Sequence, residues 1–266
     1  MPYISPLLTN IVDAVKKSAF SLDRDFSELE KLQNSVSNIK TFVMHAYQKT
    51  EQNLIVELSK IRSDIPVFTP SQKVVGDSYF AVSPIEGLIN FAHGNPDFAV
   101  SVALVEKGET ICAVIYAPAL NETFFAATGK GAFKEGYRSH ERLRVSSVKD
   151  LNTALIATTS SFEKTPEKLS KINASVLSKT SNLRISGSVA LDLAYLSGGK
   201  YDGLISLANH ISSIAAGLLI LKESGGAVRA LEQKDIRSES VAEVFKSGNL
   251  AATNFNLSQK IFEIFK

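Results

Sequence analysis

A series of short apolar segments in the middle third of the chain constrains the fold most. They are rich in β-branched and aromatic side chains and span residues 78–82, 99–105, 111–116 and 122–127. Turn residues separate them, such as Glu106-Lys107-Gly108-Glu109 between the second and third, and Gly129, Gly131 and Gly136 follow the fourth. Because strands joined by short turns pair antiparallel, we expect a meandering, largely antiparallel sheet.

The segments on either side of this sheet have a different pattern. Helical spacing of apolar residues runs through the first 60 residues, for example at Ile11, Val15, Ala19 and Leu22. After residue 150 strand-like and helical segments alternate, with helices expected over 166–179, 188–197 and 211–224 and strands over 154–158, 201–206, 227–230 and 248–253. Helices, then antiparallel strands, then an α/β segment predict a layered sandwich. We expect one domain over 1–266, with subdomains of about 1–150 and about 151–266.

Composition and charge exclude several classes of protein. The 266 residues are 44% hydrophobic, which allows a sizeable core. The net charge of +2 does not predict direct nucleic-acid binding. No apolar run approaches the ~20 residues of a membrane span, and we see no signal peptide. The single cysteine, Cys112, excludes an internal disulfide and is expected in the core. We expect a cytoplasmic protein.

Two sequence blocks carry a family resemblance. Ser83-Pro84-Ile85-Glu86-Gly87-Leu88-Ile89-Asn90-Phe91 resembles the signature Asp-Pro-(Ile/Leu)-Asp-Gly-Thr-x-Asn-Phe of the inositol monophosphatase superfamily. Ser212-Ser213-Ile214-Ala215-Ala216-Gly217, followed by Glu223-Ser224-Gly225-Gly226, is similar to its Trp-Asp-x-Ala-Ala-Gly and Glu-Ala-Gly-Gly. Between them, the block from Gly187 to Tyr195 and Asp202-Gly203 also fit. The chain looks most like the bacterial extragenic-suppressor (SuhB) branch, which implies an αβαβα sandwich of the inositol-monophosphatase type.

The resemblance implies a magnesium site, but this chain departs from it at most ligand positions. Family members hydrolyse a phosphate monoester with bound Mg²⁺, a hard ion that prefers carboxylates and other oxygen ligands. The family's acidic ligands fall on Tyr47, Pro70, Ser83, Glu86 and Ser213. Only Glu86 is a carboxylate, and together with the Ile85 carbonyl it could hold an ion weakly at most. We therefore predict no bound metal cofactor.

The catalytic and substrate positions are altered as well. The threonine that orients the attacking water falls on Leu88, which has no hydroxyl. The substrate-orienting glutamate falls on Ser206, so Gly87, Leu88 and Ser206 are a vestigial substrate site. Asp192 is interpreted as a polar residue of the scaffold. The histidines show no pair at the i, i+4 spacing of a helical metal site.

Two functions follow from these observations. The first is a phosphatase-family protein that has lost activity, or keeps very little, and acts as a regulatory or binding protein. The SuhB resemblance implies partners in ribosomal RNA transcription or ribosome biogenesis. The alternative is an active Mg²⁺-dependent inositol-1-monophosphatase or related sugar-phosphate phosphatase. The resemblance also implies a homodimer.

Overall fold

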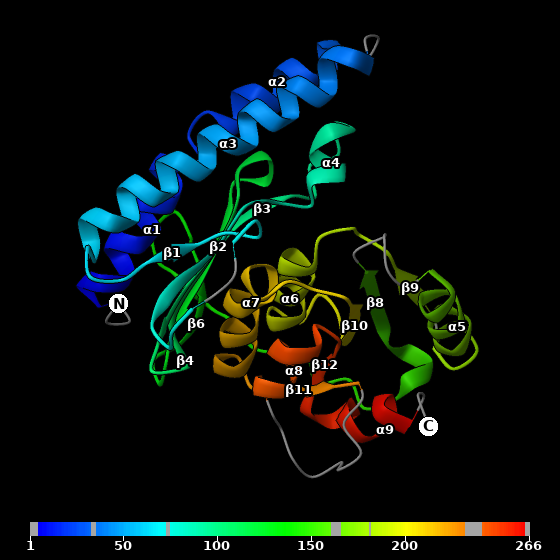
Figure 1. Ribbon diagram of the computed structural model, residues 1–266. Helices are drawn as coiled ribbons and strands as arrows, with labels where there is room; N and C mark the ends of the chain where they lie inside the picture. The colour runs from blue at the N-terminus through cyan, green and yellow to red at the C-terminus, as the bar shows by residue number, and fades with distance from the viewer. Residues whose placement is uncertain are drawn as a thin grey trace.

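The computed structural model describes residues 5–32, 36–72, 75–160, 166–180, 182–231 and 241–263, and it forms five layers (Figure 1). Helices, a sheet, helices, a second sheet and further helices follow one another through the molecule. Four clusters of buried apolar side chains fill the four interfaces between these layers. The αβαβα sandwich predicted from the sequence is therefore confirmed.

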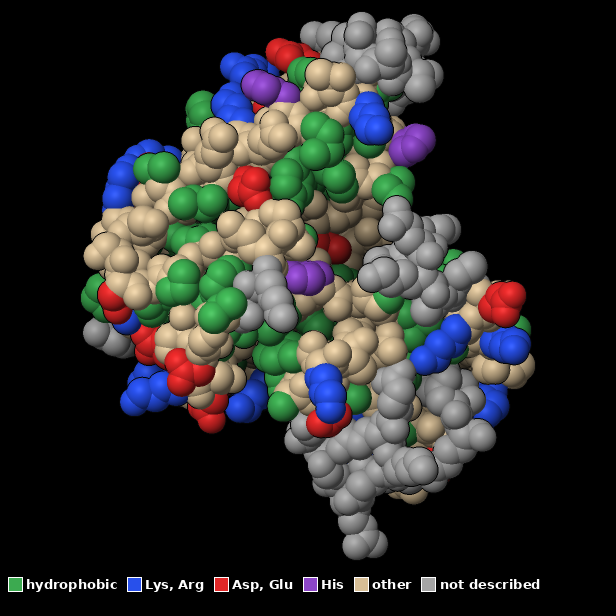
Figure 2. Space-filling view, in the orientation of Figure 1, with side chains coloured by type: hydrophobic (Ala, Val, Ile, Leu, Met, Phe, Trp, Pro, Cys, Tyr) green, Lys and Arg blue, Asp and Glu red, His purple; other side chains and the backbone are tan. Residues whose placement is uncertain are grey.

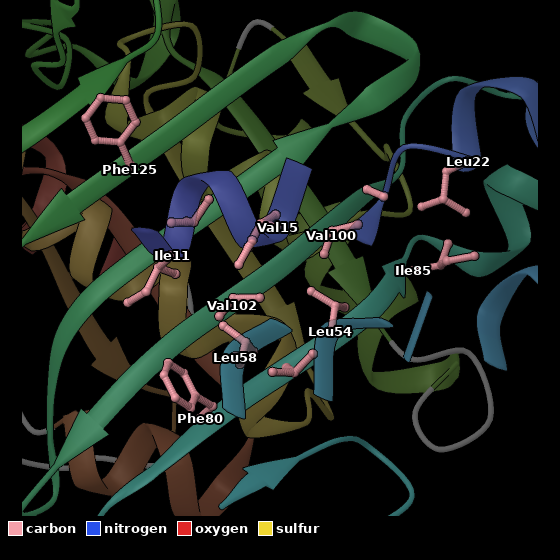
Figure 3. Close-up of a cluster of buried hydrophobic side chains, with 14 of the residues drawn as sticks. Ile11, Val15, Leu22, Leu54, Leu58, Phe80, Ile85, Val100, Val102 and Phe125 are labelled. Atoms are coloured by element: carbon pink, nitrogen blue, oxygen red, sulfur yellow. The ribbon is translucent and has the colours of Figure 1, made fainter. Parts of the chain in front are cut away.

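The outer helical layer consists of three N-terminal helices: α1 (Pro6–Ser18), α2 (Leu22–Leu32) and α3 (Val36–Ile61). Ser5 caps α1, because its side chain accepts a hydrogen bond from the backbone N–H of Leu8. Ile11 and Val15 of α1 and Leu54 and Leu58 of α3 lie on faces that turn toward the first sheet, where they meet its apolar side chains (Figure 3). No helix among the residues described is long and apolar enough to cross a membrane.

The first sheet has the strand order β1-β2-β3-β4-β5-β6-β7 within the described residues. Its strands are β1 (Val67–Phe68), β2 (Tyr79–Glu86), β3 (Ala99–Glu106), β4 (Glu109–Ala117), β5 (Glu122–Ala127), β6 (Gly131–Lys134) and β7 (Glu141–Arg142). The pairing is antiparallel from β2 to β7, and only β1 and β2 run parallel. The predicted antiparallel meander is thus correct.

The strands of this sheet are apolar on both faces, because each face is covered by helices. Side chains alternate along a strand, so Phe80 and Val82 pack on the N-terminal helices whereas Tyr79 and Ala81 face the next layer. That layer contains α6 (Val189–Ser197) and α7 (Ile211–Glu223). Cys112 is buried in the sheet, as predicted.

The second sheet has the order β11-β12-β10-β8-β9 among the described strands. These are β8 (Leu155–Ser160), β9 (Asn182–Arg184), β10 (Gly203–Leu207), β11 (Gly226–Ala230) and β12 (Leu250–Asn254). One face meets α6, α7 and α8 (Val241–Ser247), and the other meets α5 (Pro166–Leu177) and α9 (Ser258–Phe262). The described strands of the first sheet lie before position 150 in the sequence, and those of the second sheet lie after it. The division into two subdomains at this position stays a prediction.

Some elements differ from the sequence predictions. The glycine-rich stretch after residue 127, predicted as a connection, contains strand β6. The strand predicted to end at residue 82 continues to Glu86, so the signature motif begins inside β2. Gly87 then leads into a short helix, α4 (Leu88–Ala92).

Candidate functional site

The signature motif folds as a bulged strand end, a turn and a short helix. Ser83 pairs with Ser101 of β3, but the next paired residue of β2 is Glu86, opposite Ala99, so β2 carries an extra residue. Pro84 lies in this irregular part and has no N–H to donate to the ladder. Gly87 has a φ of 85°, and a Cβ there would lie 2.8 Å from the Asp97 carbonyl oxygen. The motif thus requires glycine at this turn.

Glu86 is buried and turned onto the N-terminus of α6. Its Oε2 accepts hydrogen bonds from the Ser188 hydroxyl and from the N–H of Ala190, the latter at 3.2 Å. Its Oε1 accepts from the N–H of Val189 at 3.3 Å. Burial raises the pKa of Glu86 to about 7, which its hydrogen bonds oppose and the nearby Asp192 reinforces. An anion at this position interacts favourably with the helix dipole.

Asp192 is a second buried carboxyl group in the first turn of α6. It accepts hydrogen bonds from the hydroxyls of Thr159 at 2.6 Å and Ser186 at 2.7 Å. Burial raises its pKa to about 7 as well. These contacts join β8, α6 and the loop before α6, as expected for a polar residue of the scaffold.

Asn90, from the Asn-Phe pair of the signature, ties α4 to the loop before α6. Its Nδ2 donates to the carbonyl oxygens of Asp97 at 2.7 Å and Ser186 at 2.8 Å. Gly187 lies against it, and a Cβ on Gly187 would be 3.1 Å from that Nδ2. The two motif blocks, nearly a hundred residues apart, therefore meet directly. Asn90 and Gly187 are therefore needed to hold these two segments together, whether or not a metal is bound.

Ser213 and Ser206 lie at the start of α7 and at the end of β10. His210 caps α7, because its Nδ1 accepts from the N–H of Ser212 at 3.3 Å. Burial lowers the pKa of His210, which keeps the ring neutral and able to accept this bond. The buried Ser206 hydroxyl donates to Oδ1 of Asn209 at 2.9 Å. Sequence reasoning missed the capping role of His210, because histidine is not among the residues that usually mark the start of a helix.

The remaining predicted positions carry neutral groups. Tyr47 of α3 and Leu88 of α4 both pack against the core between the N-terminal helices and the first sheet. Burial, aided by Glu51, raises the pKa of Tyr47 to about 12, so the phenol is neutral near pH 7. Pro70 is exposed in a turn after β1, where the hydroxyls of Thr69 and Ser71 are 3.0 Å apart.

The residues present do not fit a magnesium site. Within the described parts of the chain, no group of three or more His, Cys, Asp or Glu side chains could hold a metal ion. Figure 2 shows a recess between α4 and the end of the molecule that carries α5, and charged side chains are sparse on its visible walls. Serine hydroxyls can touch Mg²⁺ but do not offset its charge, and both oxygens of Glu86 are already bound to α6.

Comparisons with known proteins agree with the fold. The profile of the inositol monophosphatase family matches residues 4–264. An inositol-1-monophosphatase of Caulobacter vibrioides is 32% identical and covers 95% of this chain and 98% of its own. The Nus factor SuhB of Salmonella typhimurium is 32% identical over 84% of each chain.

Solved structures show the same relationship. The crystal structure of the extragenic suppressor protein SuhB from Bartonella henselae superimposes with a TM-score of 0.84 and 30% identity, covering 98% of this chain and 99% of that one. Its fold and its sequence both match over nearly the whole of this chain. The chain therefore belongs to the inositol monophosphatase family, with SuhB proteins among its relatives.

Proposed function

We propose that this protein has lost Mg²⁺-dependent phosphatase activity and acts as a regulatory or binding protein. The proposal rests on the side chains that occupy the family's metal-ligand positions. The family's ligand positions hold Tyr47, Pro70, Ser83, Glu86 and Ser213. The only carboxylate in this set, Glu86, is hydrogen-bonded to α6.

Negative charge decides whether these residues can hold magnesium ions. A two-metal phosphatase site needs several anionic oxygens to hold two divalent ions about 4 Å apart. A neutral phenol, a proline and two hydroxyls supply none of that negative charge at pH 7. The water-orienting hydroxyl is also missing, because Leu88 packs into the core at that position. Substrate recognition is weakened by Ser206 in the place of a glutamate, next to Gly87 and Leu88 as vestigial substrate positions.

The proposed partners are proteins of ribosomal RNA transcription or ribosome biogenesis. A relative that covers most of the chain is named Nus factor SuhB, which supports this class of partner. The family profile matches residues 4–264, and Asn90 binds the loop before α6. A surface for a protein partner could thus persist without the metal site. We further propose a cytoplasmic homodimer, by analogy with the family.

The alternative is an active inositol-1-monophosphatase or related sugar-phosphate phosphatase. It is favoured by the name of the Caulobacter vibrioides relative, which is 32% identical over nearly the whole chain. This alternative requires Mg²⁺ to bind mainly at hydroxyl and carbonyl oxygens, with Glu86 as the only carboxylate at the family's ligand positions. The two functions therefore differ in a measurable property, the affinity for divalent cations.

The test combines metal binding with turnover. We expect calorimetric titration with Mg²⁺ or Mn²⁺ to give no saturable heat up to millimolar concentration, and no phosphate release from inositol 1-phosphate. The matched positive control is the variant Ser83→Asp/Glu86→Asp/Leu88→Thr/Ser213→Asp, in which we expect Mg²⁺ to raise the melting temperature. Saturable Mg²⁺ binding by the natural chain together with turnover would establish the alternative.

The partner class needs a direct binding measurement. We expect the purified protein to bind the cognate RNA polymerase or antitermination factors in solution, measured by co-elution and by interferometry with defined components. The result should not depend on Mg²⁺ or on the Ser83 and Ser213 substitutions. If the protein bound none of these components, the proposed role in transcription would be wrong. The proposed loss of catalysis would still be tested by the metal titration.

A further inference from the structure

A hollow in the outer helical layer is lined by basic side chains and by no acidic one. It lies where α1 ends and α2 begins, beside α3 (Figure 1). Its volume is about 280 Å³, and its lining consists of Lys17, Phe20, Ser21, Arg24, Lys49 and Asn53. None of these residues is a ligand or substrate position of the family. The hollow is therefore a different place from the vestigial site.

The positive charge of this hollow is only partly balanced by the protein. Lys17 contacts Glu57 of α3 at 3.0 Å, and Arg24 contacts carboxylates of its own helix, the nearer being Asp25 at 3.2 Å. The side chains of Lys17 and Arg24 are 67% and 66% exposed, and ion pairs in such places hold weakly. Lys49 is half-buried and forms no ion pair within the part of the chain that the structure describes. An anionic ligand would thus meet three cations here.

The wall of the hollow also holds a hydroxyl group without a partner. The Oγ atom of Ser21 is buried and has no hydrogen-bond partner among the described residues. Buried hydroxyl groups in folded proteins usually have one. Asn53 follows Lys49 by one turn of α3, so these two side chains lie on the same face of the helix. A carboxylate in the hollow would accept hydrogen bonds from Ser21 and Lys49 together.

A large aromatic ring lies exposed at this hollow. Phe20, in the turn between α1 and α2, is 85% exposed. A single exposed apolar side chain is ordinary, but an aromatic ring beside an arginine is the combination that is enriched where proteins bind each other. A partner that packs an apolar side chain on Phe20 would bring its neighbouring carboxylates to Lys49 and Arg24.

We propose that this hollow is the docking surface for an acidic segment of a protein partner, in which carboxylates alternate with apolar side chains. A neighbouring hollow of about 300 Å³ shares Lys17 but also carries Asp13 and Glu57, which repel such a segment. The charge complementarity is therefore confined to the hollow at Lys49. This inference rests on the proposed role as a binding protein, to which it adds the surface and the chemistry of the partner.

The test is fluorescence anisotropy with a labelled peptide that repeats Glu-Leu-Glu-Gly. We expect saturable binding that weakens as sodium chloride is added, because salt screens exposed charges. Peptides with glutamine in place of glutamate, or with serine in place of leucine, should bind roughly tenfold more weakly. Lys49→Glu should weaken binding of the first peptide roughly tenfold, and Phe20→Ala roughly fivefold.

Lys60→Glu is the matched control. Lys60 is also an exposed residue of α3, but it lines the neighbouring hollow. Both substitutions change the net charge equally, so only docking at the proposed hollow makes Lys49→Glu the weaker binder. Melting temperatures check that each variant is folded. If Lys49→Glu does not fold, Phe20→Ala decides, because loss of an exposed ring costs little stability.

Several outcomes would overturn the inference. An equal loss of peptide binding in Lys49→Glu and Lys60→Glu would do so, as would unchanged binding in Phe20→Ala. Tighter binding to phosphatidylserine vesicles or to inorganic phosphate than to the peptide would make a membrane or a small anion the occupant. A change of oligomeric state in Phe20→Ala, measured by light scattering, would make a second copy of this chain the occupant.

The inference and the proposed function can fail separately. If Lys49→Glu bound RNA polymerase or antitermination factors as tightly as the natural chain does, the proposed function would stand and this surface would be wrong. If the natural chain bound the peptide at this hollow but none of those components, the surface would stand and the role in transcription would be wrong.

Discussion

Burial changes the acid–base behaviour of single residues in this protein. Asp192 and Glu86 both have pKa values raised to about 7 because the protein interior disfavours their charged forms. A carboxyl group with a raised pKa binds its proton more tightly in the folded than in the unfolded chain. Its contribution to stability is therefore full below the unfolded pKa, 3.8 for Asp192, and is lost as the pH rises through about 7.

The direction of this pH dependence of stability gives a prediction for Asp192→Asn. The natural chain should lose unfolding free energy between pH 5.5 and pH 8, with Asp192 responsible for about 2 kcal/mol of the loss. The asparagine variant keeps one acceptor oxygen, for either Thr159 or Ser186, and sets an NH₂ against the other hydroxyl. It has no charge to suppress, so its loss between the two pH values should be smaller by that amount. Urea unfolding at the two pH values measures both. Equal losses in the two proteins would show that Asp192 keeps its ordinary pKa.

The motif residues could be predicted from the sequence, but their contacts could not. The departures at Ser83 and Ser213 follow from the order of residues in two recognisable blocks. The partner of Glu86 lies 102 positions away, and nothing near Glu86 in the sequence indicates that its side chain turns to α6. The cap formed by His210 could not be predicted either, because histidine is not a usual capping residue.

At the scale of whole elements, regular periodicity determined what could be predicted. The strands β3 to β5 and the helices α6 and α7 have apolar runs that match their structure, and all were predicted close to their observed ends. The strand β2 was also predicted, but it continues beyond its predicted end at residue 82 to Glu86. The two-residue strands β1 and β7 have no pattern of their own, since they exist only through pairing with a neighbour. The short helix α4 depends on the left-handed turn at Gly87, which periodicity does not reveal.

The contact between α6 and α7 gives a second prediction. Gly217 lies in α7, and a Cβ there would be 2.5 Å from Cδ1 and 2.6 Å from Cβ of Leu193 in α6. Alanine usually stabilises a helix by about 1 kcal/mol relative to glycine. Here the clash should outweigh that gain, so Gly217→Ala should lower the unfolding free energy by about 1–2 kcal/mol.

A compensating change tests the cause of this effect. Leu193→Ala removes the atoms that meet the new methyl group, and alone it should cost about 2–5 kcal/mol. In the double variant Gly217→Ala/Leu193→Ala we expect a smaller loss than the sum of the two single losses, measured by denaturant unfolding. Strict additivity would mean that the two side chains do not compete for the same space.

At the scale of the whole molecule, the two sheets are joined through the central helices. Ala190 and Leu191 of α6 and Ala215 and Ala216 of α7 pack on the first sheet, whereas Leu193 and Ile214 of the same helices pack on the second. Polar contacts add to this connection, because Glu122 of β5 accepts from the Tyr195 hydroxyl at 3.0 Å. The predicted subdomains of about 1–150 and about 151–266 therefore share their middle layer.

A shared middle layer predicts a single cooperative unfolding unit. The first sheet cannot stay folded without α6 and α7, because their loss would expose its apolar face to water. We expect one calorimetric transition, and we expect Gly217→Ala, although it lies in the second half, to lower hydrogen-exchange protection equally in β3 and in β10. If the variant loosened β10 alone, or if two transitions appeared, the halves would be separate folding units. In that case the contact of Glu86 with α6 would be a bond between domains.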